Sequence, residues 1–257
     1  MKIPSLDVVI PWRDQALSGR LFRPAAAPAS SHPLPAALFI HGWSGHQDAN
    51  DVQLAAAMAQ RGFVALTFDL AGHGLSVGIR EQCTATAFLE QTIAACDLLR
   101  AQPGVDPRRV SLCGSSLGAY LALLVAAERP VANLSLRVPA NYPDEIHGQR
   151  PLAEFVNGGE LVRWRARALD AGATRSLRAL QAYRGNLQLI EAGRDEVIPR
   201  QTIENYLHAA GAVASLDHLR LADATHTVYE HLGSRRAAIR AVSEWLVAHR
   251  EDLVAAT

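Results

Sequence analysis

The sequence predicts an α/β protein built on a mostly parallel, eight-stranded sheet with helices on both faces. Short, β-prone apolar runs alternate with longer segments in which apolar residues recur at helical spacing. Most of the short runs are apolar throughout, as expected of strands that are covered on both sides. Repeated strand–helix units of this kind form right-handed crossovers within one sheet.

Eight short runs are expected to be strands. The first two flank Arg13-Asp14-Gln15 and are typical of an antiparallel hairpin at the edge of a sheet. A surface loop rich in Ala, Ser and Pro is expected over 24–35, and a turn over 103–108. The expected strands are 8–12, 16–23, 36–40, 64–69, 110–113, 134–138, 187–191 and 216–221.

Helices are expected between these strands. The segment 48–61 carries Val52, Ala55 and Ala59 on one face, and Gly62 is suited to a C-cap after it. The same apolar spacing recurs in the other helical segments, which are 84–101, 117 to about 128, 202–210 and 235–249.

The length and composition of the chain limit the classes of protein to which it can belong. The 257 residues suit one large α/β domain or two small ones. Lys plus Arg and Asp plus Glu number 25 each, and no basic stripe indicates nucleic-acid binding. No run approaches the ~18 apolar residues of a membrane span, and the first residues lack the apolar run of a signal peptide. We therefore expect a cytoplasmic protein that binds neither nucleic acid nor membrane, and its oligomeric state stays open.

Residues 139–184 interrupt the alternation of strands and helices. Prolines and glycines precede a helical stretch over 161–182, and the whole segment is too long for an ordinary connection. We interpret 139–184 as a small lid inserted into a core domain formed by 1–138 and 185–257.

The expected lid carries side chains suited to substrate binding. Tyr142, Phe155 and Trp164 either line an apolar acyl or alcohol pocket or form the small core of the lid itself. The arginines of this segment either form a solvated helix face or include one that meets an acidic group of the substrate. They are Arg163, Arg165, Arg167, Arg175 and Arg178.

One stretch, Val110-Ser-Leu-Cys-Gly-Ser-Ser-Leu-Gly118, combines a strand, a glycine-flanked turn and the start of a helix. A side chain at 114 or 118 would crowd the neighbouring backbone in such a turn. The turn pushes the Ser116 hydroxyl out of the sheet, toward the free N–H groups of the following helix. A Gly-x-Ser-x-Gly sequence in this context indicates a nucleophile elbow.

A serine hydroxyl is a poor nucleophile unless a base takes its proton. His226 and Asp195 each follow a predicted strand, and the carboxyl ends of parallel strands meet at one edge of the sheet. An imidazole accepts the proton, and a buried carboxylate fixes its tautomer. We therefore choose Ser116, Asp195 and His226 over the competing base and acid candidates, which are His218, His231, Glu196 and Asp223.

A glycine-containing loop, His41-Gly42-Trp43-Ser44-Gly45, follows the strand 36–40 at the same edge. The backbone N–H groups of Trp43 and Leu117 are the candidates for an oxyanion hole, and the His41 side chain is expected to be structural. No cluster of His, Cys and carboxylates has the spacing of metal ligands, so we expect neither a metal nor an organic cofactor.

These motifs together resemble the α/β-hydrolase superfamily over essentially the whole chain. The resemblance implies the α/β-hydrolase fold and a Ser-His-Asp triad. One departure is Ala224, because many relatives have glycine two residues before the histidine. The matching stretches are the elbow 114–118, the oxyanion loop 41–45, the turn 69–76, the acid loop 193–199 and the histidine loop 224–226.

We expect a serine hydrolase that cleaves a carboxylic ester, or a related acyl bond, of a small-molecule substrate through an acyl-enzyme on Ser116. A thioesterase or a small acyl-peptide hydrolase would use the same triad, because pocket shape decides among them. A non-catalytic ligand-binding module on this scaffold is the alternative of a different class.

Overall fold

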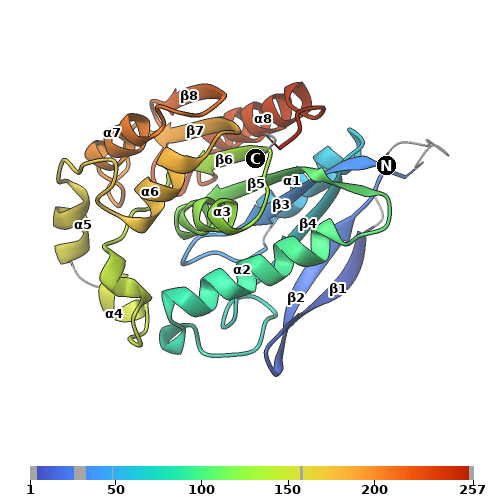
Figure 1. Cartoon of the computed structure of the whole chain (residues 1–257), viewed down its shortest axis with the longest axis horizontal. Coiled ribbons are helices and arrows are strands. Elements are labelled where there is room, and N and C mark those ends of the chain that lie inside the picture. The colour runs from blue at the N-terminus through green and yellow to red at the C-terminus, as the bar shows by residue number, and fades with distance from the viewer. Residues whose placement is uncertain (1–4, 26–32, 48, 157–158, 255–257) are drawn as a thin grey trace.

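Eight strands form one open sheet, as predicted (Figure 1). The strands are β1 (Ser5–Trp12), β2 (Gln15–Phe22), β3 (Leu34–Ile40), β4 (Val64–Phe68), β5 (Val105–Ser115), β6 (Asn133–Arg137), β7 (Asn186–Ala192) and β8 (Ser215–Leu221). Their order across the sheet is β1-β2-β4-β3-β5-β6-β7-β8. β2 is antiparallel to both β1 and β4, and all other neighbours are parallel.

This computed structural model describes residues 5–25, 33–47, 49–156 and 159–254. Most of the loop expected over 24–35 therefore lies outside the described residues, as does the first residue of the helix expected over 48–61.

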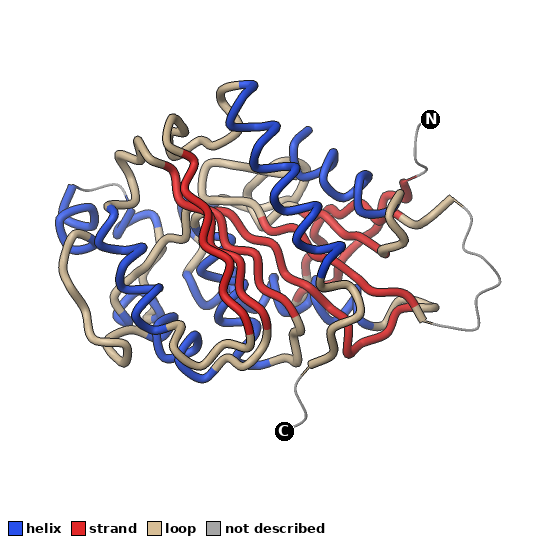
Figure 2. Tube along the Cα trace, turned by 90° about the horizontal axis from the view of Figure 1, so that it is seen from above, coloured by secondary structure: helices blue, strands red, loops and turns tan. Residues whose placement is uncertain are grey.

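The helices cover both faces of the sheet (Figure 2). They are α1 (Ala49–Ala59), α2 (Ala85–Arg100), α3 (Leu117–Glu128), α4 (Ala153–Val156), α5 (Gly159–Arg165), α6 (Arg175–Ala182), α7 (Arg200–Ala209) and α8 (Leu232–Ala248). Two short 3₁₀ turns, η1 (Arg80–Gln82) and η2 (Asp144–His147), complete the described elements.

Alternation along β3 explains why both faces are covered. Leu38 and Ile40 belong to the larger apolar core, which includes side chains of α2, α3, α6 and α7. Ala37 and Phe39 belong to a second core with α1 and α8. Successive side chains of a strand point to opposite faces, so an all-apolar strand needs a helical layer on each side.

Two expected elements differ from the structure. β5 begins at Val105, and its pairing with β3 shifts register between Leu34 and Ala36, so the turn expected over 103–108 is partly a bulged strand. The helical stretch expected over 161–182 is two helices, because α5 ends at Arg165 and α6 begins at Arg175. Thr174 accepts a hydrogen bond from the backbone N–H of Leu177, which marks a new helix start.

The helices between β6 and β7 have different surroundings. α6 packs against α3 and α7 and so belongs to the layer that covers the sheet. α4 and α5 lie at the end of the molecule opposite the β1–β2 hairpin (Figure 1). The division into a core domain and a lid over 139–184 stays a prediction, and these contacts place α6 with the core layer.

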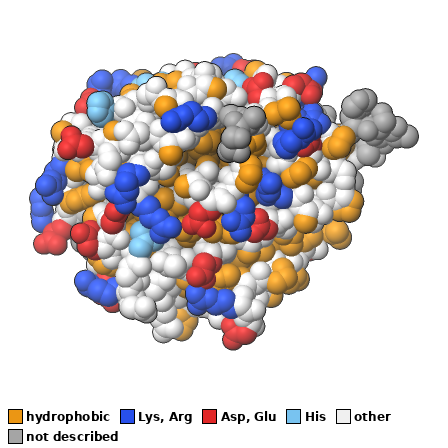
Figure 3. Space-filling model, viewed as in Figure 1, with side chains coloured by type: hydrophobic (Ala, Val, Ile, Leu, Met, Phe, Trp, Pro, Cys, Tyr) orange, Lys and Arg blue, Asp and Glu red, His pale blue; other side chains and the backbone are white. Residues whose placement is uncertain are grey.

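Charged side chains of both signs are interspersed on the face shown in Figure 3. No helix among the described ranges is both long and apolar enough to cross a membrane.

We expect Gly118→Ala to lower the free energy of unfolding by at least about 2 kcal/mol, because a Cβ there would overlap the Ile40 carbonyl oxygen. Gly172→Ala is the matched control, since a Cβ at 172 meets nothing within 4 Å. Its stability is expected to stay within about 1 kcal/mol of the wild type. Urea unfolding followed by circular dichroism measures both, and equal effects of the two substitutions would contradict this packing argument.

Candidate active site

Ser116 lies in a strained turn between β5 and α3. Its φ is +53° and its ψ −113°, values that a non-glycine residue rarely adopts. Hydrogen bonds from both backbone groups of Ser116 hold the turn. Its N–H donates to the Arg137 carbonyl oxygen at 2.9 Å, and its carbonyl oxygen accepts from the Ala140 N–H at 3.2 Å. The surrounding structure thus maintains a conformation that points the hydroxyl into a pocket.

His226 links Asp195 to the Ser116 hydroxyl. The Asp195 carboxylate accepts a hydrogen bond from His226 Nδ1–H at 2.9 Å. That bond leaves His226 Nε2 as an acceptor, and it lies 3.1 Å from Ser116 Oγ. The three predicted residues, separated by up to 110 positions in sequence, therefore form one hydrogen-bonded chain.

The Asp195 carboxylate is fixed by its own loop. Its side chain is 5% exposed, and its Oδ1 accepts the backbone N–H groups of Val197 and Ile198, both at 2.8 Å. The second oxygen, Oδ2, is thereby aimed at His226. A buried carboxylate with fixed orientation holds an imidazole in one tautomer.

The competing candidates lie elsewhere. Asp223 is 87% exposed in its side chain and pairs with Arg194 at the surface. Glu196 is exposed, His218 pairs with Glu191 on β8 and β7, and His231 is exposed at the start of α8. Among the described residues, only Asp195 forms an ion pair with His226.

The loop after β3 packs directly on the Ser116 turn. A Cβ at Gly42 would lie 3.2 Å from the Ser115 carbonyl oxygen and 3.3 Å from Ser116 Cβ. Trp43 follows this contact, and its N–H forms no hydrogen bond with any described residue. Leu117 is the first residue of α3, so its N–H has no acceptor within the helix. Both backbone N–H groups that are predicted to bind the oxyanion thus lie beside Ser116, and both are available to donate a hydrogen bond.

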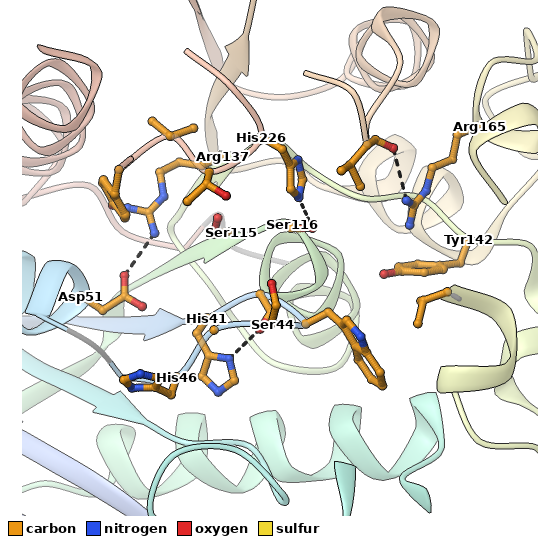
Figure 4. A pocket seen from close by; sticks show the side chains of 18 residues that line it. His41, Ser44, His46, Asp51, Ser115, Ser116, Arg137, Tyr142, Arg165 and His226 are labelled. Atoms are coloured by element: carbon orange, nitrogen blue, oxygen red, sulfur yellow. Dashed lines mark hydrogen bonds and ion pairs between the residues drawn. The ribbon is translucent and has the colours of Figure 1, made fainter. Parts of the chain in front are cut away.

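The pocket at Ser116 is lined in part by residues from the first two thirds of the expected lid, between 142 and 165 (Figure 4). Tyr142 lines it, whereas Phe155 and Trp164 do not and instead pack partly buried against the larger core. Val156, the neighbour of Phe155, takes a place in the lining. Of the three aromatic candidates, the structure brings only Tyr142 to the pocket.

Sequence reasoning missed Arg137 and Asp51, which also line the pocket and pair at 3.2 Å. A signal for Arg137 was present, because it is the one charged residue within the apolar run Leu134–Val138. Val138, which follows it, has a φ of +42°, a value that is strained for a β-branched residue. Residues with strained backbone conformations are often found at functional sites.

The His41 side chain is buried beneath the loop after β3. Its Nε2 accepts the Leu70 N–H at 3.0 Å, so the proton resides on Nδ1, which donates to the Gly42 carbonyl oxygen at 2.8 Å. Burial lowers the pKa of His41 from 6.5 to about 4. His41 is therefore a neutral structural residue, as expected, that joins the loop to the segment after β4.

We expect this histidine to make the fold sensitive to acid. The unfolded chain binds the proton below about pH 6.5 and the folded chain only near pH 4, so His41 removes stability as the pH falls between these values. The loss is roughly 2 kcal/mol between about pH 7 and about pH 5.

Urea unfolding at both pH values tests this, with His41→Asn beside the wild type and the exposed His231→Asn as control. The His41 variant should lose less stability over the range than the other two proteins. Equal losses in all three proteins would show that His41 is not the group responsible.

Residues 31–145 match a protein-family model described as serine aminopeptidase, S33. An uncharacterized protein of Mycobacterium tuberculosis is 28% identical over 205 residues, which cover 79% of this chain and 66% of that protein. Hydrolase acrC of Aspergillus aculeatus is 27% identical over 180 residues, which cover 64% of this chain and 41% of acrC. The chain thus spans less than two thirds of the length of these relatives.

Among solved structures, Est1E from Butyrivibrio proteoclasticus with ferulic acid bound is similar with a TM-score of 0.73. The two chains are 21% identical, and the match covers 94% of this chain and 98% of Est1E. At this identity the likeness is one of fold. The chain has the α/β-hydrolase fold, and the family match over residues 31–145 supports a hydrolase.

Proposed function

We propose that the protein is a serine hydrolase that cleaves a carboxylic ester through an acyl-enzyme on Ser116. One observation carries the proposal: Asp195, His226 and Ser116 form a continuous chain of hydrogen bonds that ends at a pocket. A hydroxyl, an imidazole and a carboxylate in this order supply a nucleophile, its base and the group that orients the base.

The first half of the reaction forms the acyl-enzyme. Ser116 Oγ attacks the ester carbonyl carbon while His226 Nε2 takes the hydroxyl proton, and Asp195 stabilises the imidazolium through Nδ1–H. The tetrahedral intermediate then collapses, the bond to the alcohol oxygen breaks, and His226 returns the proton to that oxygen. The alcohol leaves, and the acyl group stays on Ser116.

The second half releases the acid. A water molecule attacks the acyl carbon, and His226 Nε2 takes one of its protons. Collapse of this second intermediate breaks the bond to Ser116 Oγ, which regains a proton from His226. The carboxylic acid leaves, and the enzyme returns to its starting state.

The developing oxyanion needs fixed donors in a site with little water. We assign this role to the backbone N–H groups of Trp43 and Leu117. The donors are rigid, because Gly42 packs against the Ser116 turn and the loop closes with a hydrogen bond from the Gly45 N–H to the Gly42 carbonyl oxygen at 3.0 Å.

Ester substrates are favoured by one of the similar structures. Est1E holds ferulic acid, a carboxylic acid, and hydrolysis of a carboxylic ester releases a product of this class. The similarity to a serine aminopeptidase model favours amide substrates as the alternative. Thioesters would react by the same acyl transfer to Ser116. A panel of oxygen esters, thioesters and short acyl-peptides separates these possibilities, and a non-catalytic module would turn over none of them.

We expect Ser116→Ala to abolish hydrolysis, with a loss on the order of 10⁴–10⁶ in rate and an unchanged circular dichroism spectrum. A fluorophosphonate probe, which reacts with activated serines, should label the wild type and not this variant. Ser115→Ala is the matched control from the same turn and should still be labelled. Labelling of Ser116→Ala but not of Ser115→Ala would move the nucleophile to Ser115.

We expect Asp195→Asn to reduce kcat by a factor on the order of 10⁴, because the amide no longer holds His226 in the required tautomer. Asp223→Asn and Glu196→Gln alter exposed carboxylates and should change kcat by less than about fivefold. Steady-state kinetics on one ester compares the three variants. A crippling effect of Asp223→Asn would disprove the assignment of the acid.

A further inference from the structure

Two buried guanidinium groups line the same pocket as Ser116. Arg137, at the end of β6, is 1% exposed, and Arg165, at the end of α5, is 4% exposed. They lie on opposite sides of the Ser116–His226 pair (Figure 4). A buried charge is costly unless an opposite charge or several hydrogen bonds compensate it, so each of these cations requires a partner.

Arg137 has a partner within the protein. Its Nη2 donates to the buried Asp51 carboxylate at 3.2 Å, and its guanidinium carbon lies 4.8 Å from the centre of the Tyr229 ring. The charge of Arg137 is thus matched by Asp51, although its Nη1 has no hydrogen-bond partner among the described residues.

Among the described residues, Arg165 has hydrogen-bond acceptors but no counter-charge. Its Nε donates to the Asn141 carbonyl oxygen at 3.0 Å, and its Nη1 donates to the Val197 carbonyl oxygen at 3.4 Å. The guanidinium carbon lies 4.7 Å from the centre of the Tyr142 ring. In the described part of the chain, no carboxylate forms an ion pair with Arg165.

Other arginines of the same segment have carboxylate partners, although they are far more exposed. Arg175 pairs with Glu128 at 3.4 Å, and Arg178 pairs with Asp144 at 2.5 Å. Arg165 thus combines burial, a place in the pocket wall and the lack of an acidic partner among the described residues.

A purely structural role does not require the charge. A neutral donor such as glutamine would also reach backbone carbonyl oxygens without a buried cation. The hydrogen bonds of Arg165 to backbone carbonyl oxygens use Nε and Nη1, and its other described hydrogen-bond partner is the Tyr142 side chain, so none of these partners is a carboxylate. A guanidinium binds carboxylates through adjacent N–H groups, and the attraction is stronger in a pocket of low dielectric constant than in water.

We propose that Arg165 binds a carboxylate carried by the substrate, so that the enzyme selects esters that bear a negative charge. This inference rests on the proposed ester hydrolysis at Ser116 for its reaction. Tyr142 supports the binding group, because its ring packs against the guanidinium and lines the same pocket.

The test compares matched pairs of esters that differ only in charge. Monomethyl adipate and methyl hexanoate place the carboxylate or its neutral replacement on the acyl side. The ester 4-acetoxybutanoate and butyl acetate do so on the alcohol side. We expect the wild type to prefer the charged ester of one pair by about 10- to 100-fold in kcat/KM, the range for a hydrogen-bonded charge.

Arg165→Gln should bring this ratio close to one, and Arg165→Lys should keep part of it because the charge remains. Arg163→Gln is the matched control, since Arg163 is exposed on the same helix and should leave the ratio unchanged. The inference is wrong if the wild type shows no preference in either pair, or if Arg165→Gln keeps the wild-type ratio.

A binding measurement separates this inference from the proposed reaction. Ser116→Ala cannot form an acyl-enzyme, so calorimetry on it reports binding of intact monomethyl adipate or 4-acetoxybutanoate. We expect one of them to bind, and the affinity to fall by about 10- to 100-fold in Ser116→Ala/Arg165→Gln. Equal affinity in both proteins, or no binding to either, overturns the role of Arg165. If the fluorophosphonate fails to label the wild type while this binding difference holds, only the proposed hydrolysis is wrong.

If Arg165→Gln does not fold, the same comparisons are made with Arg165→Lys, and thermal melting establishes which variants are folded. A lysine presents one ammonium group in place of the fork of N–H groups, so we expect a weaker preference for the charged ester. Retention of the full wild-type preference and affinity in Arg165→Lys would contradict recognition by the guanidinium fork.

Discussion

Close backbone packing around Ser116 is the constraint on which the candidate site depends. The residue is held at a positive φ by hydrogen bonds to the last residue of β6 and to the segment after it, and Gly118 packs against the carbonyl oxygens at the end of β3. No side chain fits between these backbones. The same contact brings the loop of Trp43 beside the hydroxyl, so the strained turn and the candidate oxyanion donors are assembled by one interface.

Charge compensation distinguishes the two sides of the pocket. On one side, the cation of Arg137 is matched by Asp51 within the protein. Beneath the loop, burial lowers the pKa of His41 to about 4 and so keeps it neutral. On the other side, the described partners of the Arg165 guanidinium are backbone carbonyl oxygens and the Tyr142 side chain, none of which is a carboxylate. This asymmetry, more than the shape of the pocket, is the basis of the proposal that the substrate carries a negative charge.

The composition of the segment between β6 and β7 gave candidates for the pocket but did not tell which of them reach it. Aromatic residues were the natural candidates, yet Phe155 and Trp164 pack against the core while Tyr142 and Arg165 line the pocket. Helical spacing does not specify how a short helix is rotated when it packs. The expected helix is also two helices, because α5 ends at Arg165 and α6 begins at Arg175, and the two take separate directions (Figure 1).

The sequence by itself determined the sheet, its helical layers and the order of the site residues. Apolar runs at strand length and glycines at the turns act locally, so eight strands and the residues at their carboxyl ends were predictable from pattern alone. The sequence favoured Asp195 over Asp223 as the acid, and only the tertiary structure gave the physical difference: Asp195 is buried against His226, whereas Asp223 is exposed. The tertiary structure also decided that Arg137 and Arg165 face one pocket, because they lie 28 residues apart on different elements whose relative orientation depends on packing. Long-range contacts of this kind arise from how whole faces fit together, and no local pattern encodes them.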